Sequence, residues 1–276
     1  MKITAADVNK LRKQTGAGMM DCKKALVESN GDFEEAVDFL RKQGQKVAAK
    51  RSDRDASEGT VIAKTTENGK LGAIIMLNCE TDFVAQNADF VKFAENILET
   101  AISKKPADLE ALKALPYMDS GLTIAEKITE QTGVIGEKVQ LSSYGTVEAD
   151  KVVAYIHPGN RLASVVGLNK DGNYDELGRD IAMQVAAMAP VALDKDGVPQ
   201  DVIDREIEVG KEQAIQEGKP AEMAEKIAMG RLNKFYQENT LMNQSFIKDN
   251  KKSIKQYLGD AEKGLSVTAF KRFSLS

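Results

Sequence analysis

The stretch Gly59–Asn78, GTVIAKTTENGKLGAIIMLN, decides the fold class of this chain. Its beginning alternates between apolar and polar residues, which predicts a strand, and the apolar run Leu71–Leu77 predicts a second strand. Between the two lies Asn68-Gly69, a dipeptide that favours the tight turn of an antiparallel hairpin because both residues tolerate a positive φ. The sequence therefore predicts an antiparallel sheet that begins here.

The pattern of this hairpin recurs loosely further along the chain. GTVIA at 59–63 returns as GTVEA at 145–149, and each is followed by an apolar strand that ends in Leu-Asn, at 77–78 and at 168–169. An amphipathic helical pattern follows each of these strands. We therefore expect an α+β core of two related subdomains, each with a small antiparallel sheet and helices on one side. The first would comprise residues 55–144, and the second residues 145–198 and 238–276.

A helical segment, residues 199–237, interrupts the second subdomain. Gly218-Lys219-Pro220 separates two helical patterns, with Gly after the first helix and Pro at the first turn of the next. Each pattern has a narrow apolar stripe, which is typical of two helices that pack mainly on each other. We expect an inserted antiparallel coiled-coil hairpin that stands off the body. Its stripes would consist of Ile203, Ile207, Gly210 and Ala214 on one helix, and Met223, Ala224, Ile227 and Leu232 on the other.

Residues 1–54 are expected to form a separate module. Three short helices fit residues 1–43: Thr4 is a capping residue for the first, Gly31 ends the second, and Asp32 caps the third. Residues 44–58 lack core-forming side chains and predict a linker helix, with a basic stripe that is more often solvated than dedicated to binding. The apolar face of the second helix would comprise Met19, Cys22, Leu26 and Val27, and the basic stripe Lys42, Lys46, Lys50 and Arg54.

Composition and charge exclude several classes of protein. The chain has 276 residues, of which 42% are hydrophobic and 29% charged, so it can bury a core. Its net charge is −4, but residues 1–54 carry 12 basic against 8 acidic side chains. A basic module on an acidic body predicts weak affinity for nucleic acid overall. No apolar run reaches the ~20 residues that span a bilayer, and none follows the N-terminus, so we expect neither a membrane helix nor a signal peptide.

The few reactive side chains argue against an enzyme. Cys22 and Cys79 form neither a CxxC pair nor a disulfide framework, which fits a reducing cytoplasm. With His157 as the single histidine, no site can use two histidine ligands, and this residue is more often a turn or surface residue than a catalyst. The glycines form no phosphate-binding loop. We expect no catalytic residues, no metal and no cofactor, but a protein that works by contact.

One segment, Asn78–Asn87 (NCETDFVAQN), is unusual because it places Phe83 and Val84 in a polar loop after an apolar strand. In the simpler interpretation Phe83 fills the core beneath the next helix, and Thr81 or Asp82 caps a short turn. In the alternative, the loop displays an apolar wedge beside a carboxylate, suited to insertion into a partner. The residues alone leave both interpretations open and favour the first.

Several motifs resemble bacterial translation elongation factor Ts. The two most specific are Leu11–Leu26 (LRKQTGAGMMDCKKAL) and Glu80–Ala85 (ETDFVA). Shorter similarities lie at 155–157 (YIH), 221–232 (AEMAEKIAMGRL) and 241–246 (LMNQSF), where the family often has Pro in place of Ser245. The resemblance extends from about residue 3 to residue 273.

The resemblance implies guanine-nucleotide exchange on elongation factor Tu, the GTPase that delivers aminoacyl-tRNA, in the cytoplasm and without covalent chemistry. It also implies a ubiquitin-associated-like three-helix module, a two-subdomain core and a coiled-coil hairpin, in agreement with the division above. Four residues fall on the loop that in the family disturbs the partner's magnesium site: Thr81, Asp82, Phe83 and Val84. Others fall on partner contacts: Arg12, Met19, Met20 and Lys23 in the N-terminal module, and His157 in the second subdomain.

Two other classes of protein compete with this interpretation. A ubiquitin-associated-like adaptor would use the N-terminal module to bind a peptide, but would have no use for the loop Thr81–Val84. An RNA-binding protein would use residues 41–54, but that stretch lacks interleaved aromatic residues and the rest of the chain is acidic.

Overall fold

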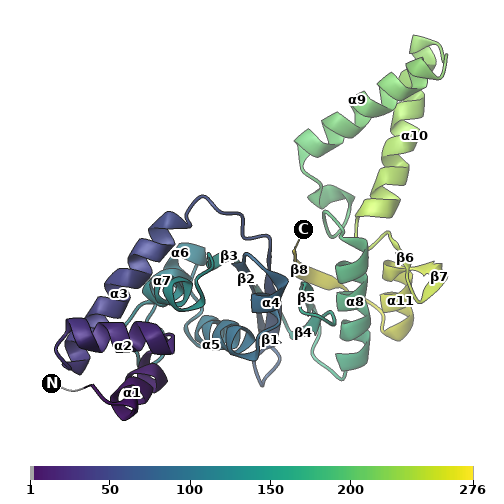
Figure 1. Cartoon of the computed structure of the whole chain (residues 1–276). Coiled ribbons are helices and arrows are strands. Elements are labelled where there is room, and N and C mark those ends of the chain that lie inside the picture. Colours follow the sequence, from purple (N-terminus) through teal and green to yellow (C-terminus); the bar gives the residue numbers. More distant parts are fainter. Residues whose placement is uncertain (1–2, 276) are drawn as a thin grey trace.

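The computed structural model describes residues 3–275 and begins with a three-helix module (Figure 1). The helices are α1 (Ala5–Thr15), α2 (Met19–Glu28) and α3 (Phe33–Lys50). The Thr4 hydroxyl accepts a hydrogen bond from the Asp7 amide, and Asp32 caps α3, as the sequence predicted. The linker helix expected after residue 43 is instead the second half of α3, so Arg54 lies beyond the helix end and outside the basic stripe.

The apolar face predicted for α2 is only half correct. Cys22 and Leu26 are fully buried, but Met19 and Val27 are 56% and 54% exposed. Ala25 completes the buried stripe, because it lies three residues after Cys22 and therefore on the same face of the helix. Together with Met20, which is 75% exposed, three large apolar side chains of α2 are thus left on the surface.

Residues Gly44 of α3 and Gly133 of α7 (Ile124–Ile135) bring these two helices into backbone contact. A Cβ at Gly133 would overlap the Cα of Gly44, so only glycine permits this approach. Val134 of α7 also packs against the core of the three-helix module. The module is therefore docked on the body through α3, and Gly44 does not break the helix.

The first sheet has the antiparallel order β1-β2-β3. The predicted hairpin is confirmed as β1 (Glu58–Thr65) and β2 (Leu71–Cys79), and β3 (Gln140–Glu148) pairs with β2. One face of the sheet packs against α5 (Ala88–Lys104) through Phe90, Phe93 and Ile97. The other helices of this part are the short α4 (Asp82–Ala85) and α6 (Leu109–Ala114), together with α7.

The second sheet repeats this topology in the order β4-β5-β8. A hairpin of β4 (Lys151–Ile156) and β5 (Leu162–Leu168) leads to α8 (Asp175–Met188), and β8 (Val267–Ser274) adds a third strand beside β5. Short elements complete this part: η1 (Lys195–Gly197), β6 (Ser245–Phe246), β7 (Asp249–Ser253) and α11 (Ile254–Ala261). Two subdomains of related topology with antiparallel sheets, as predicted, therefore form the core.

The two sheets also pack against each other, which the sequence did not indicate. Alternate residues of β1 and β2, such as Val61 and Ile74, meet Val152 and Val165 of the second sheet. Each sheet thus has helices on one face and the other sheet on its second face, because side chains of a strand alternate between faces. This arrangement holds the two subdomains together.

The five-residue repeat does not mark equivalent strands. GTVIA lies in the first strand of its sheet, whereas GTVEA lies in and just after β3, the third strand of the same sheet. The Leu-Asn pairs do end equivalent strands, β2 and β5. The predicted boundary between 144 and 145 falls inside β3, so the sheet of the first subdomain ends at Glu148 instead.

Two helices, α9 (Gln200–Gln216) and α10 (Ala221–Asn239), extend away from the body (Figure 1). They approach closely at Gly210, where a Cβ would meet Ala228 at 3.2 Å. Met223, predicted to lie in the seam, is 53% exposed because it sits in the first turn of α10, before the buried Ala224. A coiled-coil geometry for this pair stays a prediction.

Candidate functional site

The loop between β2 and α5 presents an exposed aromatic ring. Thr81 caps the four-residue helix α4, and its hydroxyl oxygen accepts a 3.5 Å hydrogen bond from the Val84 amide. Val84 packs partly against the core and Ala85 is buried, but Phe83 is 85% exposed. The interpretation of Phe83 as a core residue is therefore wrong, since Phe90 and Phe93 already cover the sheet.

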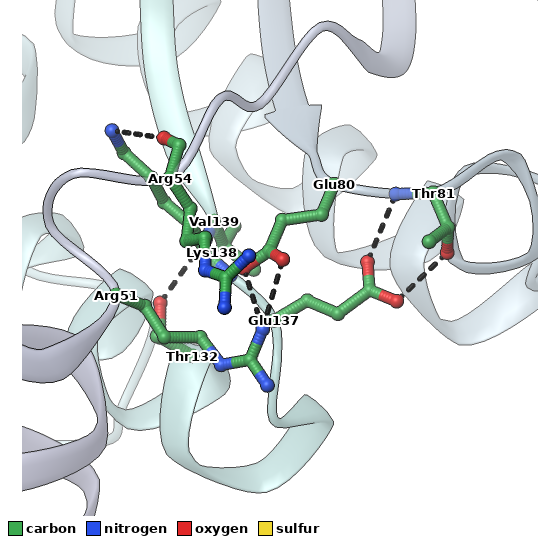
Figure 2. Close-up of polar contacts among 8 residues, drawn as sticks. All are labelled: Arg51, Arg54, Glu80, Thr81, Thr132, Glu137, Lys138 and Val139. Carbon is green, nitrogen blue, oxygen red and sulfur yellow. Dashed lines mark hydrogen bonds and ion pairs between the residues drawn. The ribbon is translucent and has the colours of Figure 1, made fainter.

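Glu137 holds the beginning of this loop. It follows Gly136, which ends α7 with φ 79°, and its carboxylate faces Thr81 (Figure 2). The Thr81 amide donates to one carboxylate oxygen at 3.0 Å, and the Thr81 hydroxyl donates to the other at 2.8 Å. Both polar donors of Thr81 are thus satisfied by one side chain that lies 56 residues away in the sequence.

Glu80 makes a second set of contacts on the opposite side of the chain (Figure 2). The Lys138 amide donates to its carboxylate at 2.6 Å, and Nη1 of Arg51 lies 2.9 and 2.8 Å from its two oxygens. These donors, the Lys138 amide first, lower the pKa of Glu80, so the carboxylate is charged at neutral pH. The Lys138 ammonium donates to the carbonyls of Ser52 and Arg54, which adds a further tie to the segment after α3.

Cys79 lies beneath the loop and cannot act as a nucleophile. Its thiol is buried and donates to the Thr81 carbonyl at 3.2 Å. Burial, and secondly the negative charge of Glu137, raise the pKa of Cys79 to about 12. Since the thiolate is the reactive form, this cysteine contributes packing rather than chemistry.

A surface groove of about 560 Å³ runs beside the loop. Val84 and α5 residues Phe90 and Phe93 line one side, while Val134 of α7 and Gly16 of the N-terminal module line the other. The residue after Phe83 and the N-terminal module therefore line a common hollow of the surface.

The N-terminal residues singled out by the sequence are all exposed. Arg12 is on α1, and Met19, Met20 and Lys23 are on α2. Met20, at 75% exposure, is among the most exposed apolar side chains of the described residues. Met19 is 56% exposed, so the module leaves two large apolar side chains at the start of α2 in solvent.

His157 lies apart from these residues, in the turn between β4 and β5. Its amide donates to the Leu162 carbonyl at 2.8 Å, and its Nδ1 lies 2.9 Å from the Tyr155 hydroxyl. The turn touches β1, because the Val61 amide donates to the Asn160 carbonyl at 2.6 Å. His157 is exposed and occupies a turn, as its sequence context predicted, and the structure does not place it in the Thr81–Val84 loop.

Within residues 3–275 no group of three or more His, Cys, Asp or Glu side chains could hold a metal ion. In the same described part of the chain, no helix has the length and apolar character needed to cross a membrane.

Sequence reasoning missed the residues that brace the loop. Arg51, Glu137 and Lys138 belong to no motif, and they reach the loop only because α7 lies between α3 and the first sheet. The one available signal was Gly136, a residue that commonly ends a helix and turns the chain.

Comparison with known proteins gives a consistent family. The family model described as "Elongation factor TS" matches residues 80–276, beginning at Glu80 of the loop. The elongation factor Ts of Cytophaga hutchinsonii is 56% identical over 276 residues, covering 99% of both chains. That of Porphyromonas gingivalis is 51% identical over 276 residues, covering 100% of this chain and 99% of its own.

This chain belongs to the elongation factor Ts family. The elongation factor Ts of Christiangramia forsetii, 53% identical over 99% of both chains, agrees with the assignment. Membership in the elongation factor Ts family makes the chain a factor of translation elongation in protein biosynthesis, as its motifs predicted. The relatives align with the N-terminal module as well as the core, so the family extends to the part that the family model leaves uncovered.

Proposed function

We propose that this chain is a guanine-nucleotide exchange factor for elongation factor Tu and promotes the release of GDP. The observation that carries the proposal is the 85% exposure of Phe83 on a loop whose beginning is held by hydrogen bonds to Thr81 and Glu80. A large apolar ring is costly to leave in water, and it gains free energy when a partner covers it. Membership in the elongation factor Ts family supports the choice of partner.

The loop Thr81–Val84 would act on the partner's magnesium site. A P-loop GTPase retains its nucleotide through magnesium and the loop that holds the phosphates. Magnesium requires near-octahedral oxygen ligands, so a small shift of the protein ligands weakens its binding. An aromatic ring inserted between partner helices imposes such a shift without touching the nucleotide. The exchange factor then needs no covalent chemistry, no metal and no cofactor of its own.

Asp82 contributes in a different way from Phe83. Its exposed side chain begins α4 and faces outward, while its carbonyl accepts a hydrogen bond from the Gln86 amide at 3.0 Å. The outward position favours a role towards the partner, by repelling acidic groups that hold magnesium, over a role in holding the loop.

Further contacts would supply binding energy over a broad surface. The exposed Arg12, Met19, Met20 and Lys23 form one part and His157 another, and methionine adapts well to a partner surface. We assign the N-terminal helices a ubiquitin-associated-like module, and α9 and α10 a coiled-coil insert. The partner is a protein in the cytoplasm, and neither nucleic acid nor a membrane takes part.

Exchange must be reciprocal. If this chain weakens the binding of nucleotide by some factor, nucleotide weakens the binding of this chain by the same factor. Entry of GTP therefore helps to release the exchange factor, and the cycle can repeat.

The test is the release of labelled GDP from elongation factor Tu, with and without this chain. We expect catalytic amounts of the chain to accelerate release. Binding without acceleration would indicate an adaptor instead and would contradict the proposal.

A further inference from the structure

The contacts that brace the loop are made by partly buried groups and have no place in the exchange step as described. We propose that Glu137 is a positioning residue for exchange, which fixes the orientation of the Thr81–Val84 loop, and that the Arg51–Glu80 ion pair connects the same loop to the N-terminal module. This inference rests on the proposed function, since it concerns how Phe83 is presented to the partner.

Glu137 determines how the loop begins. Its two oxygens accept from two donors of one residue, the amide and the hydroxyl of Thr81, at 3.0 and 2.8 Å. Two hydrogen bonds to one residue restrict both its backbone and its side-chain torsion. With its hydrogen directed at Glu137, the Thr81 hydroxyl turns a lone pair to the Val84 amide and caps α4. The direction of α4, and hence of Phe83, follows from this arrangement.

The loop needs such an external hold. Helix α4 has only four residues, far fewer than an isolated helix requires in water. Phe83 is exposed and does not anchor the loop by its own burial. Inward packing comes only from Val84, partly buried, and Ala85. Without Glu137, the ring would sample many directions and would occupy its productive direction only part of the time.

The residue after Glu137 supplies the second hold. The Lys138 amide donates to Glu80, which also pairs with Arg51 just beyond α3. The adjacent residues 137 and 138 therefore bind Thr81 and Glu80, respectively, on either side of the peptide bond that joins these two residues (Figure 2). The Glu80 side chain is 16% exposed and that of Arg51 is 35% exposed, so the ion pair is partly shielded from solvent.

These two residues are themselves fixed to α7. The Val139 amide donates to the Thr132 hydroxyl at 3.2 Å, and that hydroxyl donates to the Ile128 carbonyl within the helix. Helix α7 in turn contacts α3 through Gly133. The position of the loop is thus set by α7, the same helix on which the N-terminal module docks. The module and the loop are thereby presented to one partner in a fixed relation.

A test can read the loop in the free protein, because the chain contains no Trp. Phe83→Trp places a single indole at the exposed position, and time-resolved fluorescence anisotropy reports its local motion. In this background we expect Glu137→Ala to increase the amplitude of fast local motion. Glu137→Gln should restore order, since its amide can accept from the Thr81 amide and donate to the Thr81 oxygen. Glu110→Ala is the matched control, because Glu110 pairs only locally with Lys113 on α6.

Exchange kinetics in the Phe83 background then show whether order matters for function. We expect Glu137→Ala to lower the maximal rate of GDP release about tenfold, because a loosely held ring is in its productive orientation for only a fraction of the time. The partner concentration at half-maximal rate should change less than about twofold, because the rest of the interface is intact. A purely destabilising mutation would instead lower the melting temperature and the active fraction, and would leave the rate per folded molecule unchanged.

The inference is overturned if Glu137→Ala leaves the anisotropy decay as it is in Glu110→Ala, or if Glu137→Gln is as impaired as Glu137→Ala. The proposed function fails separately, if wild-type chain does not accelerate GDP release. The anisotropy measurement uses no partner, so it decides the positioning role even then.

Discussion

Replacing Phe83 with Ala separates a partner-binding role from a structural one. The side chain is 85% exposed, so its loss leaves no cavity. We expect a change in unfolding free energy within about 0.5 kcal/mol, as for other surface substitutions, whereas truncation of a buried Phe costs ~3–5 kcal/mol. Phe93→Ala, at a position 6% exposed, is the internal standard for that larger cost.

The exposed surface area of the Phe83 ring sets an upper limit on how much Phe83→Ala can lower the rate of GDP release. A Phe side chain offers on the order of 150 Å² of surface when 85% of it is free, which is worth about 4 kcal/mol if a partner buries it fully. That free energy limits the loss of rate to about 10³-fold. We expect a decrease of at least ~10-fold, because only the part gained between bound state and transition state contributes to rate.

The assay is stopped-flow release of fluorescent GDP from elongation factor Tu, with urea unfolding of the same preparations. Ile247→Ala is a matched control, because Ile247 is 43% exposed in the turn between β6 and β7, away from the loop. This variant should promote GDP release at the wild-type rate. If Phe83→Ala unfolds like wild type and also promotes GDP release at the wild-type rate, the proposal that Phe83 inserts into the partner is refuted. A large loss of stability would instead revive the core interpretation.

Other predictions concern stability and the placement of modules. The pKa of Glu80 is lowered, mainly by the Lys138 amide, so its stabilising contribution is complete above the unfolded value of about 4.3 and is lost as pH falls through the lower native value. Glu80→Gln should therefore destabilise at neutral pH and flatten the loss of stability below about pH 4.3 in urea unfolding; an unchanged acid profile would contradict this. Gly133→Ala should lower the free energy of unfolding by about 1–3 kcal/mol, because the added methyl group forces α3 away from α7. The control Gly230→Ala places its methyl group in open space and should not destabilise the protein. Equal stability of the two variants would show that the glycine contact is dispensable. Replacing residues 199–237 by a Gly/Ser link should leave the melting transition of the core within about 4 °C, and a collapse of that transition would show that the hairpin belongs to the core.

The sequence predicted elements where the local pattern alone determines them. The hairpin at Asn68-Gly69 and the caps at Thr4 and Asp32 are confirmed, because turn and capping chemistry act over a few residues. The continuation of α3 through Gly44 was not predicted, since the glycine that weakens an isolated helix here permits contact with another helix.

Exposure was harder to predict than secondary structure. Met19 and Val27 fit a helical stripe, but the module has too little core to cover them. The loop segment taken alone favoured a core position for Phe83. The family resemblance favoured an exposed position, as did the apolar side chains of the following helix, which already cover the sheet. The braces from Arg51 and Glu137 depend on contacts between residues 29 and 56 positions apart, which no local pattern encodes.

The central claim is that Phe83 acts through the partner's magnesium site. Its most direct test is the rate of GDP release from elongation factor Tu, measured with wild type and Phe83→Ala over a series of free magnesium concentrations. We expect excess magnesium to slow the GDP release that the wild-type chain promotes. When magnesium is removed, the release rates measured with wild type and with Phe83→Ala should become nearly equal. A constant ratio of their rates at all magnesium concentrations would contradict the account.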